Sequence, residues 1–280
     1  MKNIVIITNI DKDPNLTYTN KLKALISDKY NVRCDTEPEK YAEAISGADV
    51  LIVLGGDGTI LTCAGNAARF GVPILGINLG TLGFLAEVEK SEAEKAISAL
   101  LSGEYTVEER FMLEATVLRD GEEVYHNCAL NDFVLSRSSF RRMISTNVYV
   151  ENSHVASYDG DGLIVSTPTG STGYNLSAGG PIVDASLFAA VITPICPHSN
   201  FSSSIVVPAD KVVRVCVKDS FSKQSMLTTD GQHGFELECS DEVIIKASSS
   251  KAKLIKVHDR SFYDVLALKN ITGKQDIQHD

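Results

Sequence analysis

The sequence predicts two domains, an α/β domain built around a parallel sheet and then a β-rich domain, and three observations support this fold class. The chain has 280 residues, and at roughly 150 residues per domain this length favours two domains. Before about Glu108, short apolar runs alternate with segments of helical periodicity. After it, short alternating runs are separated by turn residues. The first pattern is typical of βαβ units, and the second is typical of antiparallel sheets.

The first domain is expected to alternate strands and helices from its start. Apolar runs predict buried strands at Asn3–Thr8, Val32–Asp35, Asp49–Leu54 and Val72–Ile77. Apolar residues at helical spacing predict helices at Tyr18–Ser27, Pro38–Ile45, Ile60–Phe70 and Ser91–Leu101. Ser91 and Glu94 fit a capping box at the start of the last helix, and Gly103 follows its end.

The second domain is expected to consist mainly of short strands separated by turns such as Asp120-Gly121. Alternating or apolar runs predict strands at Leu113–Arg119, Val124–Arg137, Asn147–Val150, Gly162–Ser166, Ile205–Val207, Val212–Val217, Phe235–Glu238 and Val243–Lys246. A short helix is expected at Ala185–Ile192. A final strand at Ala252–Val257 precedes a helix at Phe262–Leu268 and a polar tail from Thr272 that is expected to fray.

Composition and charge exclude several classes of protein. Apolar residues make up 44% and charged residues 22%, which is ordinary for a soluble globular protein. Acidic residues number 36 and basic residues 26, for a net charge of −10. With no basic run longer than Arg141-Arg142, neither nucleic acid nor a membrane is an expected partner. The apolar start lacks the long core and cleavage site of a signal peptide, so we expect a cytoplasmic protein.

The six cysteines carry no recognisable metal motif. None forms a CxxC pair, and Cys196 lies two residues before His198. Two ligands do not make a zinc site. The cysteines are therefore expected to be small buried side chains in a reducing compartment, and His198 is expected to be structural.

The strongest motif is GGDGT, Gly55–Thr59, which follows a predicted buried strand and precedes a predicted helix. Such a loop offers backbone N–H groups and a helix N-terminus to an anion such as phosphate. Asp57 would repel phosphate, and two roles would justify its presence: binding Mg²⁺, or accepting a proton from a hydroxyl nucleophile. The alternative is a plain glycine turn with Asp57 as the helix N-cap.

Three further clusters are candidates for a ligand site. The segment Asp159–Tyr174 combines glycines with the hydroxyls of Ser166, Thr167, Thr169, Ser171 and Thr172. It is predicted to bind ribose, phosphate or an adenine edge, or else to be a solvated loop. Asn131-Asp132 lies inside a strand-like run, which indicates either a bulge aimed at a ligand or a turn. Asp230-Gly231-Gln232 is typical of a hairpin turn.

The order of these clusters resembles the NAD kinase family. GGDGT, GINLGTLGFL at Gly76–Leu85, ND, DGLIVSTPTGSTGY and DGQ occur in that order. The P-loop GxxxxGK[ST] and the dinucleotide fingerprint GxGxxG are both absent. The resemblance implies a Rossmann-like N-terminal domain with a parallel sheet, formed by residues 1–108 and 258–280, and a β-rich NAD-binding domain formed by residues 109–257.

The resemblance also implies an activity and a set of site residues. The expected reaction phosphorylates the 2′-hydroxyl of the adenosine ribose of NAD, with ATP or polyphosphate as donor, a divalent metal such as Mg²⁺, and a homodimer or homotetramer as the active form. Asp57 matches the catalytic aspartate, and no residue is assigned to the metal. The residues expected to bind NAD or nucleotide are Gly55, Gly56, Gly58, Thr59, Asn131, Asp132, Asp161, Thr172, Gly173, Tyr174 and Ser177.

The sequence departs from the family pattern at several positions. Gly173 replaces the usual Ala of the nucleotide-binding run TAYxxS, and Asn200 and Ser203 stand where many relatives have Leu and Arg. Two alternative functions remain open at this point. One is a non-catalytic dinucleotide sensor, and the other is a lipid or sugar kinase of the same superfamily.

Overall fold

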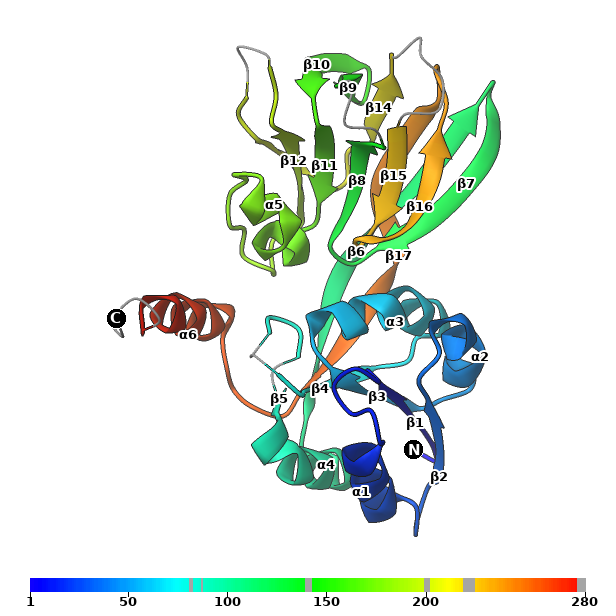
Figure 1. The fold of residues 1–280 in the computed structure, drawn as a ribbon, viewed down its shortest axis with the longest axis vertical. Coiled ribbons are helices and arrows are strands. Elements are labelled where there is room, and N and C mark those ends of the chain that lie inside the picture. The colour runs from blue at the N-terminus through cyan, green and yellow to red at the C-terminus, as the bar shows by residue number, and fades with distance from the viewer. Residues whose placement is uncertain (81–82, 87, 139–142, 199–201, 219–224, 276–280) are drawn as a thin grey trace. The chain divides into compact units, whose positions relative to one another are not determined.

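The computed structural model describes residues 1–80, 83–86, 88–138, 143–198, 202–218 and 225–275, with the backbone alone at 233 and 270–275. Two compact units make up the chain, Met1–Glu109 with Lys251–Asp280, and Arg110–Ser250. The sequence places the second boundary later, after Val257. The predicted fold class, an α/β unit and a β-rich unit, is confirmed (Figure 1). Arg141-Arg142, Asn200 and residues 276–280 lie outside the described residues.

The first unit is built on a parallel sheet with the strand order β2-β1-β3-β4. These strands are β1 (Asn3–Thr8), β2 (Asn31–Asp35), β3 (Val50–Gly55) and β4 (Ile74–Asn78). Every residue of β3 and β4 is buried, which is why both read as continuous apolar runs. Beside β4 lie the short strand β5 (Val88–Glu89) and the end of β17 (Glu242–Lys256), both parallel to it.

Helices cover both faces of this sheet. The core on one face combines β1 and β3 with α1 (Thr17–Ile26) and α4 (Ala93–Ser102). The 3₁₀ turn η1 (Pro38–Lys40) leads into α2 (Tyr41–Ile45), which packs with α3 (Asp57–Phe70) on β1, β3 and β4. The last helix, α6 (Phe262–Gln275), runs past Thr272, so the tail predicted to fray is helical at its start.

The capping-box prediction for α4 is wrong. A 3₁₀ turn, η2 (Lys90–Glu92), precedes the helix and contains Ser91. The N-cap of α4 is therefore Glu92, and no side-chain cap hydrogen bond is found there among the described residues. At the other end the prediction is confirmed, because Gly103 adopts the left-handed conformation that glycine favours, with φ 81°.

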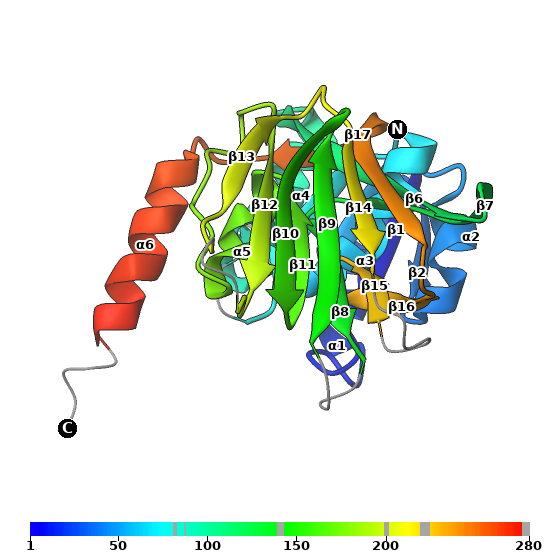
Figure 2. The same cartoon turned by 90° about the horizontal axis from the view of Figure 1, so that it is seen from above.

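The second unit contains a six-stranded antiparallel sheet in the order β13-β12-β11-β8-β15-β16. These strands are β8 (Asp132–Arg137), β11 (Gly162–Ser166), β12 (Ala189–Ile195), β13 (Ile205–Pro208), β15 (Ser225–Thr229) and β16 (Gln232–Leu237). A second row is β10 (Ser153–Gly160), β9 (Ile144–Val150), β14 (Val213–Val217) and β17, seen side by side in Figure 2. The hairpin of β6 (Thr106–Arg119) and β7 (Glu122–Ala129) joins β17.

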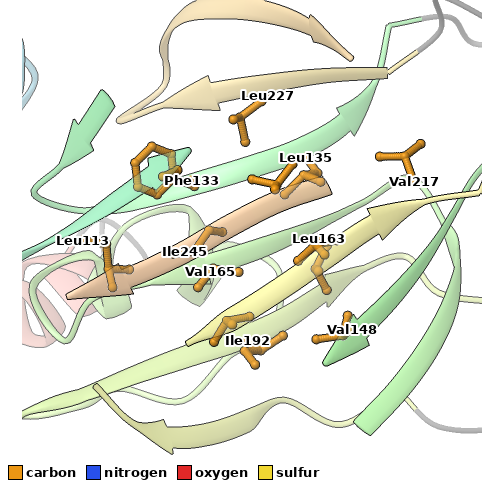
Figure 3. Packing of buried hydrophobic residues seen from close by; sticks show 14 of the residues in the cluster. Leu113, Phe133, Leu135, Val148, Leu163, Val165, Ile192, Val217, Leu227 and Ile245 are labelled. Carbon is orange, nitrogen blue, oxygen red and sulfur yellow. The ribbon is translucent and has the colours of Figure 1, made fainter. Parts of the chain in front are cut away.

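One apolar core holds this unit together. Its side chains come from both rows of strands, among them Leu113, Phe133, Val148, Leu163 and Ile245 (Figure 3). Strands β14 and β15 bury every second residue, because the alternate side chains point out of the core. This period of two is the signal that predicts the β-rich unit from the sequence.

Two sequence predictions in this unit are corrected, and strands β10 and β15 are found where none is predicted. The run Val124–Arg137 is two strands, β7 and β8, with a turn between them. The helix predicted at Ala185–Ile192 is wrong, because residues from Ala189 onward form β12 and pair with β11 and β13 on both sides. Strand β10 was not predicted, since its alternate polar residues are exposed and resemble a loop.

The lengths of the helices and the exposure of the cysteines test two further expectations. No helix in the described part of the chain is long and apolar enough to cross a membrane. All six cysteines lie in that part and are free, but Cys63 alone is fully buried. Cys34, Cys196 and Cys239 are exposed, so the prediction of uniformly buried cysteines is wrong.

Candidate active site

The GGDGT motif lies at the carboxyl end of β3, where Gly55 ends the strand and Asp57 begins α3. The helix starts earlier than predicted, and its N-cap is Gly56 rather than Asp57. The alternative in which Asp57 caps the helix is therefore wrong. A Cβ on Gly55 would overlap the side chain of Thr59, so only glycine fits at this tight turn.

The Asp57 carboxylate is bound to a second segment of the chain. Its Oδ2 accepts a hydrogen bond from the backbone N–H of Phe84 at 2.8 Å. Its Oδ1 accepts from the N–H groups of Leu85 and Ala86, both at 3.0 Å. A side chain at Gly83 would overlap this carboxylate. Asp57 therefore fixes residues 83–86 against the start of α3. Among the described residues, Oδ2 accepts one donor, whereas a carboxylate oxygen can accept two.

The carboxyl ends of three neighbouring strands meet at this loop. After β1, the Asn9 N–H donates to the carbonyl of Leu54 at 2.8 Å, and its side-chain amide lies 3.3 Å from Thr59 Oγ1. After β4, the Leu79 N–H donates to the carbonyl of Gly55 at 2.8 Å. In an open parallel sheet, this is the edge at which ligands bind.

A lysine supplies positive charge at the same edge. Lys12 Nζ lies 3.0 Å from the position that a Cβ on Gly56 would take, and 3.2 Å from that of Gly80. It lines a hollow of about 410 Å³ bounded by Asn9, Lys12, Gly56, Asp57, Gly58, Thr59, Gly83 and Lys269. Sequence reasoning missed Asn9, Lys12, Gly83 and Lys269. The one signal in the sequence was that Asn9 and Lys12 follow a predicted buried strand, as GGDGT does.

In the second unit, Asp230 joins two turns. Its carboxylate accepts hydrogen bonds from the backbone N–H groups of Leu130, Asn131 and Asp132 at 2.9, 2.7 and 3.1 Å. In return, the Asp230 N–H donates to the carbonyl of Asp132 at 2.9 Å. The ND motif is a turn rather than a bulge, and the DGQ motif forms the predicted hairpin turn between β15 and β16. The structure thus brings the ND and DGQ motifs together.

Burial raises the pKa of both Asp132 and Asp230. Burial, and then the charge of Asp230, raise the pKa of Asp132 to about 7. Burial also raises the pKa of Asp230 to about 6, and this outweighs the effect of its three N–H donors.

The hydroxyl-rich segment after β11 is a buried scaffold. Thr167 Oγ1 donates to the carbonyl of Leu130 at 2.6 Å, and Ser166 Oγ donates to that of Asn131 at 3.2 Å. Ser171 Oγ lies 3.1 Å from the carbonyl of Val183 and 3.0 Å from its N–H. These three hydroxyls are fully buried and bind the protein itself. The segment is neither a solvated loop nor, through these side chains, a ligand contact.

The scaffold places part of the predicted nucleotide-binding run beside Asn131. Two short helical turns, η3 (Thr169–Thr172) and α5 (Tyr174–Ser177), follow β11. A Cβ on Gly173 would lie 3.3 Å from Asn131 Nδ2. Asn131 Oδ1 is buried without a hydrogen-bond partner in the described part of the chain. Tyr174 and Ser177 are exposed. Asn131, Gly173 and the start of α5 therefore form one cluster.

Asp161 lies apart from this cluster. It precedes Gly162, which pairs with Ser136, whereas Ser166 at the far end of the strand pairs with Asp132. Asp161 is five residues from Ser166, and at about 3.3 Å per residue this separation is about 16 Å. Asp161 Oδ1 instead lies 3.0 Å from the Arg137 guanidinium. Farther along, His198 and Ser203 are exposed.

Two family models match the chain. The ATP-NAD kinase N-terminal domain matches residues 8–105, and the ATP-NAD kinase C-terminal domain matches residues 130–257. The chain belongs to the NAD kinase family. NAD kinases of Natranaerobius thermophilus and Carboxydothermus hydrogenoformans are 42% and 45% identical to it. The matches cover 99% and 89% of this chain, and 100% and 88% of those proteins.

Solved structures of NAD kinases have the same fold. An NAD kinase from Archaeoglobus fulgidus, solved in complex with ATP, superimposes with a TM-score of 0.77 and 25% identity, over 94% of this chain and 98% of that one. A yeast NADH kinase, solved with NADH, has a TM-score of 0.84 and 22% identity, over 95% of this chain and 86% of that one. The NAD kinase fold is therefore shown by sequence and by structure.

Proposed function

We propose that this protein is an NAD kinase, which transfers a phosphoryl group from ATP or polyphosphate to the 2′-hydroxyl of the adenosine ribose of NAD and gives NADP. The observation that carries the proposal is the position of Asp57. Its carboxylate is fixed at the N-terminus of α3 and lines a hollow that Lys12 also lines. Membership of the NAD kinase family also supports this reaction.

The first unit is proposed to hold the phosphate donor. Phosphoryl transfer depends mainly on positioning and on stabilising the charge of the moving oxygens. The N-terminus of α3 and the ammonium groups of Lys12 and Lys269 supply positive charge around the hollow. The expected contacts of the donor are Gly55, Gly56, Gly58 and Thr59.

A divalent metal fits this hollow through the donor. Mg²⁺ usually takes one or two carboxylates together with substrate phosphates. Asp57 is the one carboxylate among the residues that line the hollow, and its Oδ2 accepts one donor from the described residues. When bound, the metal would neutralise charge on the phosphates.

Asp57 is proposed as the general base. The ribose hydroxyl is a weak nucleophile while it keeps its proton, and Oδ2 has a lone pair in position to accept it. The hydrogen bonds from residues 84–86 hold the carboxylate still during this step. The phosphoryl group then bonds to the ribose oxygen as its bond to the donor breaks.

The second unit is proposed to bind NAD. Asn131 Oδ1 is an unused acceptor beside Gly173, and Tyr174 and Ser177 are accessible next to it. Asp132 and Thr172 belong to the same proposed site. Asp161 must contact a different part of the dinucleotide from Asn131, because it lies at the other end of β11. A weaker NAD affinity in Asp161→Ala, with the Arg137→Met variant unchanged, would support a direct contact.

We propose a homodimer or homotetramer that works in the cytoplasm, without nucleic acid or membrane partners. The six free cysteines support the cytoplasmic location, and the net charge of −10 supports the lack of nucleic-acid and membrane partners. The oligomer is proposed from the family resemblance alone.

Steady-state formation of NADP tests the proposal. NAD and NADH are each offered against ATP and polyphosphate, with and without Mg²⁺. NADP formation that needs the metal is expected. Binding of NAD without turnover would favour the sensor, and phosphorylation of a lipid or sugar alone would favour the other kinase class.

A further inference from the structure

Outside the two nucleotide loops, three side chains of different chemistry converge on one face of the β6–β7 hairpin. Glu114, His126 and Cys128 each place one ligand atom within 4.8 Å of the others. Cys128 lies opposite Glu114 in the register, and His126 lies opposite Thr116. Because side chains two residues apart on a strand point to the same face, His126 and Cys128 stand beside each other.

This face is separate from the core. Tyr125 stacks on Phe235 and its hydroxyl lies 3.1 Å from Thr229 Oγ1, so the alternate residues of β7 point toward the packed interior. On the opposite face, His126 is exposed, and Glu114 and Cys128 are partly exposed. A small ion from solvent can therefore reach all three.

Each of the three side chains is already oriented by a neighbour. Thr116 Oγ1 lies 3.2 Å from His126 Nδ1, and Ser248 Oγ lies 3.7 Å from Cys128 Sγ. Lys246 Nζ lies 3.2 Å from Glu114 Oε1. Outer residues that fix the direction of the ligands are a regular part of metal sites.

We propose that Glu114, His126 and Cys128 form a binding site for Zn²⁺. One nitrogen, one sulfur and one oxygen are the donor types that zinc prefers, and three protein ligands leave a fourth position open. With metal–ligand bonds of about 2.0–2.3 Å, tetrahedral ligands lie roughly 3.3–3.8 Å apart. Side-chain rotations that move the ligand atoms by about 1 Å bring the present separations of up to 4.8 Å into that range.

Zn²⁺ must displace one ion-pair partner of Glu114, and its binding releases one proton from Cys128. The ammonium of Lys246 must leave Glu114. Because the Lys246 side chain is 53% exposed, this ion pair is weak. The thiol of Cys128 loses its proton to solvent as the metal–sulfur bond forms. The proposal is independent of the kinase activity, because none of the three residues belongs to the proposed nucleotide sites.

Titration of the purified full-length protein with Co²⁺ and then Zn²⁺, without nucleotide, tests the site. Co²⁺ should bind with a sulfur-to-cobalt charge-transfer band, and one equivalent of Zn²⁺ should remove it. His126→Ala, Cys128→Ser and Glu114→Gln should each weaken Zn²⁺ binding at least about 10-fold. Cys196→Ser, the matched control at the other closely spaced cysteine–histidine pair, should leave the affinity unchanged.

The Lys246→Gln variant gives a result of opposite sign. Freeing Glu114 should strengthen Zn²⁺ binding by up to ~5-fold, the scale of an exposed ion pair. Calorimetry in two buffers of different ionisation heat should show release of about one proton. The absence of a charge-transfer band, or Zn²⁺ binding that survives in all three ligand variants, would overturn the proposal.

Discussion

Asp57 combines two properties at the scale of a single residue. It anchors residues 83–86 through three backbone hydrogen bonds, and it is the proposed general base. An isosteric change therefore has a structural consequence as well as a chemical one.

Asp57→Asn should lower kcat by about 10²–10⁴-fold, because the amide cannot take the ribose proton. It should also lower the free energy of unfolding by roughly 1–3 kcal/mol, since an NH₂ group would face backbone N–H donors. Steady-state kinetics and urea denaturation measure the two effects. Normal turnover would assign the base to another residue.

Gly83→Ala should impair the same step without changing any titratable group. The added Cβ would overlap the Asp57 carboxylate and displace it. A displacement of about 1 Å can cost about 10²-fold in rate. We expect a lower kcat with an unchanged pH profile. An active, folded Gly83→Ala enzyme would show that the position of Asp57 matters little.

At the scale of an element, α1 is capped from a distance. Its N-cap residue Leu16 gives no side-chain cap, and Asp13 takes that role. The Asp13 carboxylate accepts hydrogen bonds from the N–H of Tyr18 at 3.2 Å and from the N–H and hydroxyl of Thr19 at 2.8 and 2.7 Å. Burial alone would raise the pKa of Asp13, but these donors lower it.

Asp13→Ala should therefore destabilise the protein by about 1–2 kcal/mol at neutral pH. Because the folded pKa lies below the unfolded one, this stability is present above the unfolded value near 4 and is lost as pH falls through the folded value. Thermal unfolding from pH 3 to 8 should show the difference shrinking at the acid end. Asp28→Ala, an exposed aspartate after the same helix, should change stability by less than about 0.5 kcal/mol.

Elements also show what the sequence could and could not predict. Val50–Leu54 was predictable because a buried parallel strand needs apolar residues on both faces. The helix predicted at Ala185–Ile192 is wrong because β12 is stabilised by pairing with β11 and β13, which its own local sequence does not reveal. The Asp57 contacts left no signal, since their donors are backbone groups that every residue type has. His126 and Cys128 share a face because they lie two residues apart on a strand. Their proximity can therefore be inferred only once this segment is known to be a strand.

At the scale of the whole molecule, the pair Asp132 and Asp230 makes stability depend on pH. Burial raises the pKa of Asp132 to about 7, so the folded state keeps a proton that the unfolded chain releases near pH 4. Between these values the folded state binds more protons, and stability falls as pH rises. In this acidic chain, the Asp132–Asp230 pair is thus a place where raising the pH from about 4 to 7 weakens the fold.

Asp132→Asn should flatten this dependence. The variant should be more stable than the wild type at pH 8, by at most about 4 kcal/mol, and the advantage should vanish near pH 4. Asp230→Asn is the contrasting case, because the amide would face three N–H donors and should destabilise at every pH. Denaturant midpoints across the pH range compare the three proteins. Parallel curves for the wild type and Asp132→Asn would contradict the assigned proton.

The six cysteines give the protein native sites for chemical labelling that differ in exposure. Cys34 lies on a strand of the first unit, Cys196 and Cys239 lie in the second, and all three side chains are exposed. Cys63 is buried, and burial raises the pKa of its thiol, so it should resist alkylation until the chain unfolds. A maleimide dye would mark both units without any introduced residue. Delayed labelling of Cys63 would then report the opening of the α/β unit alone.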